Sequence, residues 1–102
     1  MTTTTQTQMP LPKLKMDGQA LRGACLMELF EILHINYSVK DWGVEVKPHP
    51  IMKDWFSVQV WVVMLHKEKT FQPFEITPDT DYDSLRNVLW VEGEIINQWI
   101  NE

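Results

Sequence analysis

Cysteine, glycine and long apolar runs are scarce in this chain of 102 residues, and each scarcity excludes a class of protein. The single cysteine, Cys25, has no second cysteine to pair with, which excludes an intramolecular disulfide scaffold of the secreted kind. No apolar run reaches the roughly 18 residues of a membrane-spanning helix. The four glycines spell neither a phosphate-binding loop nor a dinucleotide-binding fingerprint. We therefore expect a cytoplasmic protein with no membrane partner.

Basic side chains are also in deficit. Nine lysines and arginines stand against 14 aspartates and glutamates, so the formal net charge is −5. Residues 1–16 contain Lys13 and Lys15 and no acid, whereas the acids gather in residues 79–102. Because an acidic surface repels polyphosphate, we expect no nucleic-acid partner.

The composition predicts one folded domain. Apolar residues make up 44% of the chain, which is enough for a core at this length without disulfide or metal staples. The first 15 residues are rich in threonine and glutamine and contain Pro10 and Pro12, which block helix formation. We therefore expect a flexible tail over residues 1–15 and a single domain over residues 16–102.

Two segments show the periodicity of amphipathic helices. The first begins at the capping residue Asp17 and extends for about 18 residues, to the neighbourhood of Asn36. The second begins at Thr80 or Asp81. The expected apolar arcs are Leu21, Cys25, Leu26, Leu29, Phe30, Ile32 and Leu33 in the first helix, and Leu85, Val88, Leu89, Ile95, Ile96, Trp99 and Ile100 in the second. Glu92 falls inside the second arc, where it could pair with a base at a strand end, such as His66 or Lys67, or lie on the rim; we expect the rim.

Between these helices the sequence predicts three strands. Apolar and polar residues alternate over residues 41–47, β-branched and aromatic residues dominate Trp55 to His66, and a third strand follows at Thr70 to Ile76. Pro73 lacks a donor for the ladder, so the third strand belongs at an edge. The resulting fold class is α+β: an αβββα two-layer domain with a three-stranded antiparallel sheet and both helices on one face.

Several patterns invite metal chemistry or catalysis. Glu31 and His34 are spaced as ligands on one helix face, but only one copy of this pair is present. Asp79, Asp81 and Asp83 have the spacing that starts a calcium-binding loop, yet the glycine and the glutamate that complete such a loop are missing. Helix capping explains these acids better. We expect no catalytic residue, no metal and no cofactor, and we keep a small metal- or ligand-binding enzyme as the alternative function.

A second alternative is RNA binding, because double-stranded RNA-binding domains resemble this chain in element order and size. That family uses a basic start of its second helix to contact phosphates. Residues 79–87 (DTDYDSLRN) contain three acids and one arginine at the equivalent place. The charge pattern therefore argues against this alternative.

The long strand has two apolar rows, and two helices can cover only one of them. The row Phe56, Val58, Val60, Val62 and Met64 is expected to face the helices. The opposite row, which contains Trp55, Trp61, Val63 and Leu65, is then exposed unless the N-terminal tail or the Lys47 to Asp54 loop folds over it. With Trp90 as a satellite, these four residues predict a non-enzymatic interaction module (an adaptor, assembly factor or inhibitor) that binds another protein or a second copy.

Four segments also carry a family resemblance: INYSVKDWGVEV, WFSVQVWVVML, FQPFEI and LRNVLWVEGEIINQWI. Their aromatic and aliphatic spacing resembles a small domain family of cyanobacteria and chloroplasts that has no assigned activity. The resemblance covers roughly residues 17–100. It implies a cytosolic or stromal accessory protein and transfers no catalytic residue.

Overall fold

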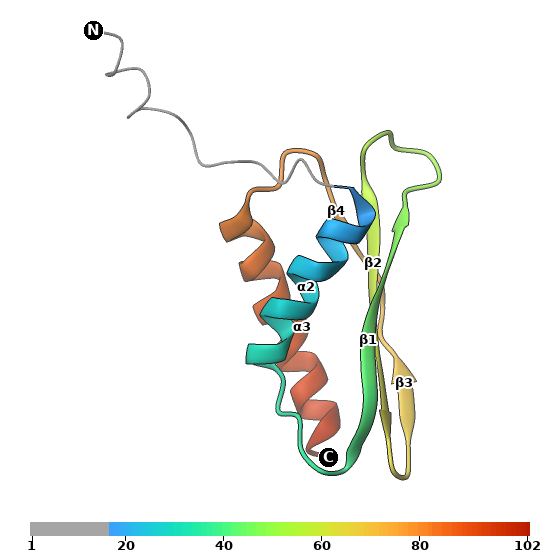
Figure 1. Cartoon of the computed structure of the whole chain (residues 1–102), viewed down its shortest axis with the longest axis vertical. Coiled ribbons are helices and arrows are strands. Elements are labelled where there is room, and N and C mark those ends of the chain that lie inside the picture. Colours follow the sequence, from blue (N-terminus) through green and yellow to red (C-terminus); the bar gives the residue numbers. More distant parts are fainter. Residues whose placement is uncertain (1–16) are drawn as a thin grey trace, which may run out of the picture.

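The computed structural model describes residues 17–102, so the predicted tail lies outside the described residues. The elements are α2 (Gly18–Ile32), β1 (Val39–Pro48), β2 (Phe56–Met64), β3 (Glu68–Thr70), β4 (Phe74–Ile76) and α3 (Tyr82–Ile100). Both helices lie on one side of an antiparallel sheet, and no described helix lies on the other (Figure 1). The predicted two-layer α+β fold is confirmed.

The centre of the sheet is β2, which pairs with β1 along one side and with both β3 and β4 along the other. The third strand that the sequence predicts over residues 70–76 is thus two short strands, and the first begins at Glu68. The break falls at residues 71–73. There Phe71 turns into the core with 3% of its surface exposed, and Pro73 has no N–H to donate. The edge position predicted from Pro73 is confirmed.

The core lies between the helices and the inner row of β2. Val58 and Val62 are fully buried and Val60 is 1% exposed, while Leu85, Leu89 and Ile96 of α3 meet them with no exposed surface. Strand alternation predicts this inner row, and the structure confirms it. The core also contains Leu21, Cys25, Leu29, Ile32, Leu33, Val44, Met64, Phe71, Ile76 and Ile100.

Two expectations for the first helix are wrong. α2 ends at Ile32 rather than near Asn36, and its buried residues form only the narrow stripe Leu21, Cys25, Leu29 and Ile32. Phe30, expected in the buried arc, is 71% exposed, and Leu26 is partly buried. The reason is the place of α2 in the fold. It packs on the edge strand β1 and on α3, so its remaining side faces solvent.

Both predicted N-caps are confirmed. The Asp17 carboxylate accepts a hydrogen bond from the Ala20 N–H at 2.8 Å. The Asp81 carboxylate accepts one from the Ser84 N–H, also at 2.8 Å. Each bond satisfies a donor that the first helical turn leaves unpaired.

Candidate protein-interaction face

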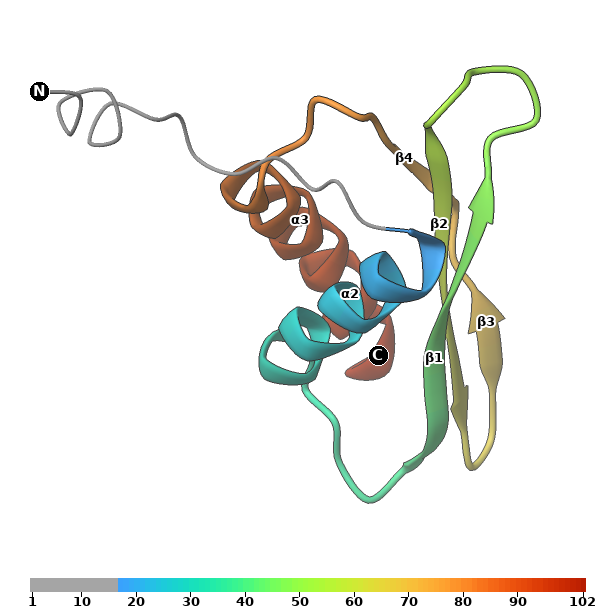
Figure 2. The same cartoon turned by 45° about the horizontal axis from the view of Figure 1, so that its top comes forward.

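The side of the sheet turned away from the helices is called the outer face here. Since alternate residues of a strand point to opposite sides, the pairing register assigns its members. They are Asp41, Gly43, Glu45 and Lys47 of β1, Ser57, Gln59, Trp61 and Val63 of β2, Glu68 and Thr70 of β3, and Glu75 of β4. Figure 2 shows both helices on the opposite side of the sheet, which leaves the outer face open.

Trp61 sits near the middle of this face, directly opposite Gly43 of β1 and Thr70 of β3. A Cβ atom built on Gly43 would lie 2.6 Å from Cζ2 of the Trp61 ring. The indole therefore lies across the β1 backbone, where only glycine leaves room for it. This contact explains why Trp61 is partly buried although no described segment is layered over the outer face.

Trp55 lies at the far end of the row, about 20 Å from Trp61 if β2 rises by its ordinary 3.3 Å per residue. Polar residues, Ser57 and Gln59, separate the two tryptophans. Trp55 makes an edge contact with the ring of His49, with 5.9 Å between the ring centroids. The row is therefore not one continuous apolar stripe.

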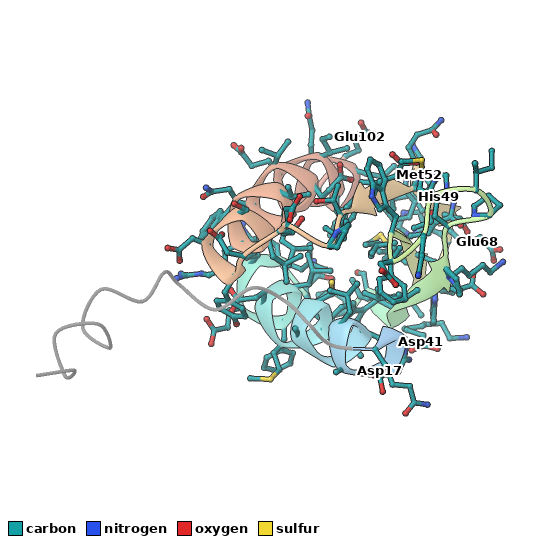
Figure 3. All side chains as sticks on the ribbon, turned by 90° about the horizontal axis from the view of Figure 1, so that it is seen from above. Asp17, Asp41, His49, Met52, Glu68 and Glu102 are labelled. Carbon is teal, nitrogen blue, oxygen red and sulfur yellow. The ribbon has the colours of Figure 1, made fainter. Side chains whose placement is uncertain are left out.

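His49 organises the loop beside Trp55. Its Nδ1 accepts the N–H groups of Ile51 and Met52 at 3.1 and 3.0 Å, and its Nε2 lies 2.8 Å from a carboxylate oxygen of Glu75. With Nδ1 accepting, the proton of the neutral ring sits on Nε2 and is donated to Glu75. Figure 3 shows His49 and Met52 together in this loop. The loop thus packs at the Trp55 end of the face.

The structure groups some of the predicted contact residues and separates others. Trp61 and Val63 share the outer face, and Leu65 follows just past the end of β2 with 62% of its surface exposed. Trp55 is partly buried at the opposite end. Trp90 is 54% exposed on α3, in the helical layer. It therefore belongs to a different surface from the other four residues.

An apolar surface that the sequence reading missed lies between α2 and the free side of β1. Leu26, Met27, Phe30, Glu31 and Trp42 line a shallow hollow there. Met27 and Phe30 are each 71% exposed. The signal was available, because the apolar residues of α2 span about half of the helix circumference, more than the stripe that a surface helix needs for its core.

Residues considered for metal chemistry have other roles in the structure. His34 Nδ1 lies 3.1 Å from the side-chain nitrogen of Asn101. Asp81 caps α3, and its hydrogen bonds from Ser84 lower the pKa of its carboxyl. Over residues 17–102 there is no cluster of three or more His, Cys, Asp or Glu side chains able to hold a metal ion.

Glu92 lies at the rim of the buried side of α3, as expected, with part of its surface exposed. Burial raises the pKa of its carboxyl, because desolvation disfavours the charged form. The lysine considered as its partner, Lys67, is instead bound to the Trp99 carbonyl. Glu92 therefore remains on the rim without pairing to Lys67.

Cys25 is fully buried, and desolvation raises the pKa of its thiol to about 12. Since the thiolate is the reactive form, we expect almost no reaction with a disulfide reagent such as dithionitrobenzoate at pH 8 in the folded protein. In denaturant the same thiol should react fully. The check is the rate of thionitrobenzoate release with and without urea, and stoichiometric release from the folded protein at the denatured rate would contradict a buried thiol.

The chain matches no family model, no curated protein and no solved structure. The family resemblance of its aromatic spacing therefore stays a prediction. None of the helices described in residues 17–102 combines the length and the apolar character needed to cross a membrane.

Proposed function

We propose that this protein is a cytoplasmic, non-enzymatic interaction module, acting as an adaptor, assembly factor or inhibitor, and that the outer face is its contact surface. The observation that carries the proposal is the position of Trp61. Its indole is fixed on Gly43 near the middle of a face that no described helix covers, with Val63 on the same strand. A tryptophan that is partly exposed and already ordered buries a large apolar area on binding at little entropic cost.

The surroundings of Trp61 have the arrangement that protein contacts use. Val63 extends the apolar centre along β2 and Leu65 follows just past the end of the strand, while Gln59 and Thr70 provide polar groups beside it. An apolar centre with a polar rim is the usual anatomy of a protein interface. An antiparallel sheet with one uncovered face ordinarily has polar residues there, so an aromatic and aliphatic centre on that face indicates a partner.

The test compares Trp61→Ala with Trp90→Ala, since each removes one partly exposed tryptophan but from different layers of the fold. Proteins retained from a lysate by the full-length wild type are identified, and the affinity of each is then measured with purified components. We expect Trp61→Ala to lose about 2 kcal/mol or more of binding free energy, about 30-fold in Kd, and Trp90→Ala to bind as the wild type does.

Circular dichroism and urea unfolding of both variants show whether the fold survives. A Trp61→Ala variant that is folded and binds every retained protein with wild-type affinity would refute the outer face as the contact surface. Equal losses in both variants would refute it as well, because the effect would then not be confined to this face.

A further inference from the structure

We infer that the partner presents a basic segment, with lysine or arginine side chains, to the outer face. This inference rests on the proposed function and names the chemistry of the partner. Its basis is the charge of the face, to which the pairing register assigns Lys47 and four carboxylates: Asp41, Glu45, Glu68 and Glu75. Lys40 lies at the bulge of β1, where the register gives it no partner.

The carboxylates flank the apolar centre. Val63 stands between Asp41 on β1 and Glu68 on β3, because both are its register partners. Glu45 stands opposite Gln59, on the other side of Gly43 from Asp41 along β1. Directly opposed residues of an antiparallel sheet have Cβ atoms about 5 Å apart, so these acids lie within reach of a side chain placed on Trp61 or Val63.

The lysines next to β3 do not neutralise this face, because they turn toward the helices. Lys67 donates to the Trp99 carbonyl at 2.6 Å, and its Nζ lies 4.4 Å from the centroid of the Trp99 ring. Lys69 stands opposite the inward-facing Val62, with its Nζ 5.2 Å from the ring centroid of Phe71. The negative end of the α3 dipole favours Lys67 at that place. Lys67 and Lys69 thus lie on the side of the sheet opposite to Glu68 and Asp41.

Contacts within the chain hold Asp41 and Glu45 only weakly, whereas Glu75 is hydrogen-bonded to His49 at 2.8 Å. The Glu45 and Lys47 side chains are 3.7 Å apart and both are more than half exposed, so their attraction is screened by water. Asp41 is exposed and accepts a hydrogen bond from the N–H of Trp42 at 2.9 Å. Arg22 lines a hollow at the β1 edge together with Glu45 and Trp61, and it donates its Nε–H to the Val44 carbonyl at 2.8 Å. A cationic partner therefore replaces the weak contacts that Asp41 and Glu45 make within the chain with stronger contacts to its own cations.

Charge also decides between a basic partner and a second copy of this chain. Two copies that met through their outer faces would bring carboxylates against carboxylates, which opposes association. A basic segment instead makes favourable electrostatic and apolar contacts. The cation of a lysine or arginine can sit over the Trp61 ring beside Asp41 or Glu68, and the aliphatic part of its side chain can pack on Val63.

The experiment uses the ¹⁵N-labelled full chain and three blocked hexapeptides, in which alanine alternates with arginine, with glutamine or with glutamate. Substituting Trp61→Phe identifies the indole N–H resonance of Trp61. We expect the arginine peptide to shift this resonance saturably at low salt and to leave that of Trp90 in place. A glutamine peptide that shifts it equally would overturn the basic partner.

Charge-neutralising variants test which acids act. Asp41→Asn with Glu68→Gln removes two charges beside Val63, whereas Glu94→Gln with Glu102→Gln removes two from the helical layer and the C-terminus. The first pair of substitutions should raise the Kd for the arginine peptide about fivefold or more, and the second pair should raise it by less than about twofold. Equal losses would mean that only net charge matters, which would contradict docking on this face.

Two further outcomes distinguish a basic partner from occupation of the face by the chain's own lysines and from failure of the proposed function. In the full chain, Lys13→Gln with Lys15→Gln should leave the Trp61 resonance unchanged without peptide, and a shift would assign the face to the chain's own lysines instead of a partner. If the arginine peptide fails to bind while Trp61→Ala still abolishes capture of a protein partner, the basic partner is refuted and the proposed function stands.

Discussion

Gly93→Ala should lower the free energy of unfolding by about 1 to 3 kcal/mol, and Gly23→Ala should raise it by about 0.5 to 1 kcal/mol. Both glycines lie inside helices, where alanine is ordinarily the better residue. At Gly93 of α3, however, a Cβ would lie 2.3 Å from Cγ2 of Ile32 on α2. At Gly23 it would meet nothing within 4 Å. The two helices thus cross in contact at Gly93, and the chain accepts a poor helix former there to gain this packing.

Urea unfolding of both variants measures these opposite changes. Adding Ile32→Ala supplies the second half of a double-mutant cycle, because it removes the atom with which the new methyl collides. Gly93→Ala should then cost less in the Ile32→Ala background than in the wild type, by about 1 kcal/mol or more. Additive costs, or a Gly93→Ala variant as stable as Gly23→Ala, would show that the helices do not meet at this glycine.

Local sequence patterns were sufficient to predict those features that one short segment determines by itself. Asp17 and Asp81 cap the helices as predicted because a capping carboxylate needs only a backbone N–H three residues away. The inner row of β2 follows from alternation alone, and Pro73 confines its strand to the edge because proline has no N–H.

Features set by distant residues were not predictable in the same way. The packing of the Trp61 ring against Gly43 depends on the register between β1 and β2, which no local pattern specifies. The exposure of Phe30 depends on which strand α2 covers, and a helix over an edge strand keeps more of its apolar surface in solvent. For the candidate site, the sequence thus predicted the outer row, but neither the separation of Trp55 and Trp90 from Trp61 nor the acids around Val63.

The end of α2 shows the same dependence on distance and leads to the second large effect. Asn97 of α3 accepts the N–H of His34 at 2.6 Å and donates to the carbonyl of Ile32 at 3.1 Å. It thereby binds the chain on both sides of Leu33, whose extended backbone ends the helix while its side chain enters the core. The C-terminal end of α2 is thus set by Asn97, which is 63 residues away from His34 in the sequence. The residues around Asn36 therefore could not predict where the helix ends.

Asn97→Ala should therefore lower the free energy of unfolding by about 1 to 3 kcal/mol, because it leaves two backbone groups without a partner. Alanine is the better helix former, so intrinsic propensity predicts the opposite sign. Asn97→Asp can still accept from His34 but cannot donate to Ile32, and it places a negative charge near the C-terminal end of α2, so we expect a loss at least as large. The matched control is Gln98→Ala, one residue along on the exposed side of α3, which should be neutral or slightly stabilising.

Urea unfolding measures the stability of each variant. Faster hydrogen exchange of the His34 amide in Asn97→Ala would place the loss of stability at the end of α2. An Asn97→Ala variant that is as stable as Gln98→Ala would mean that Leu33 is held by its burial alone.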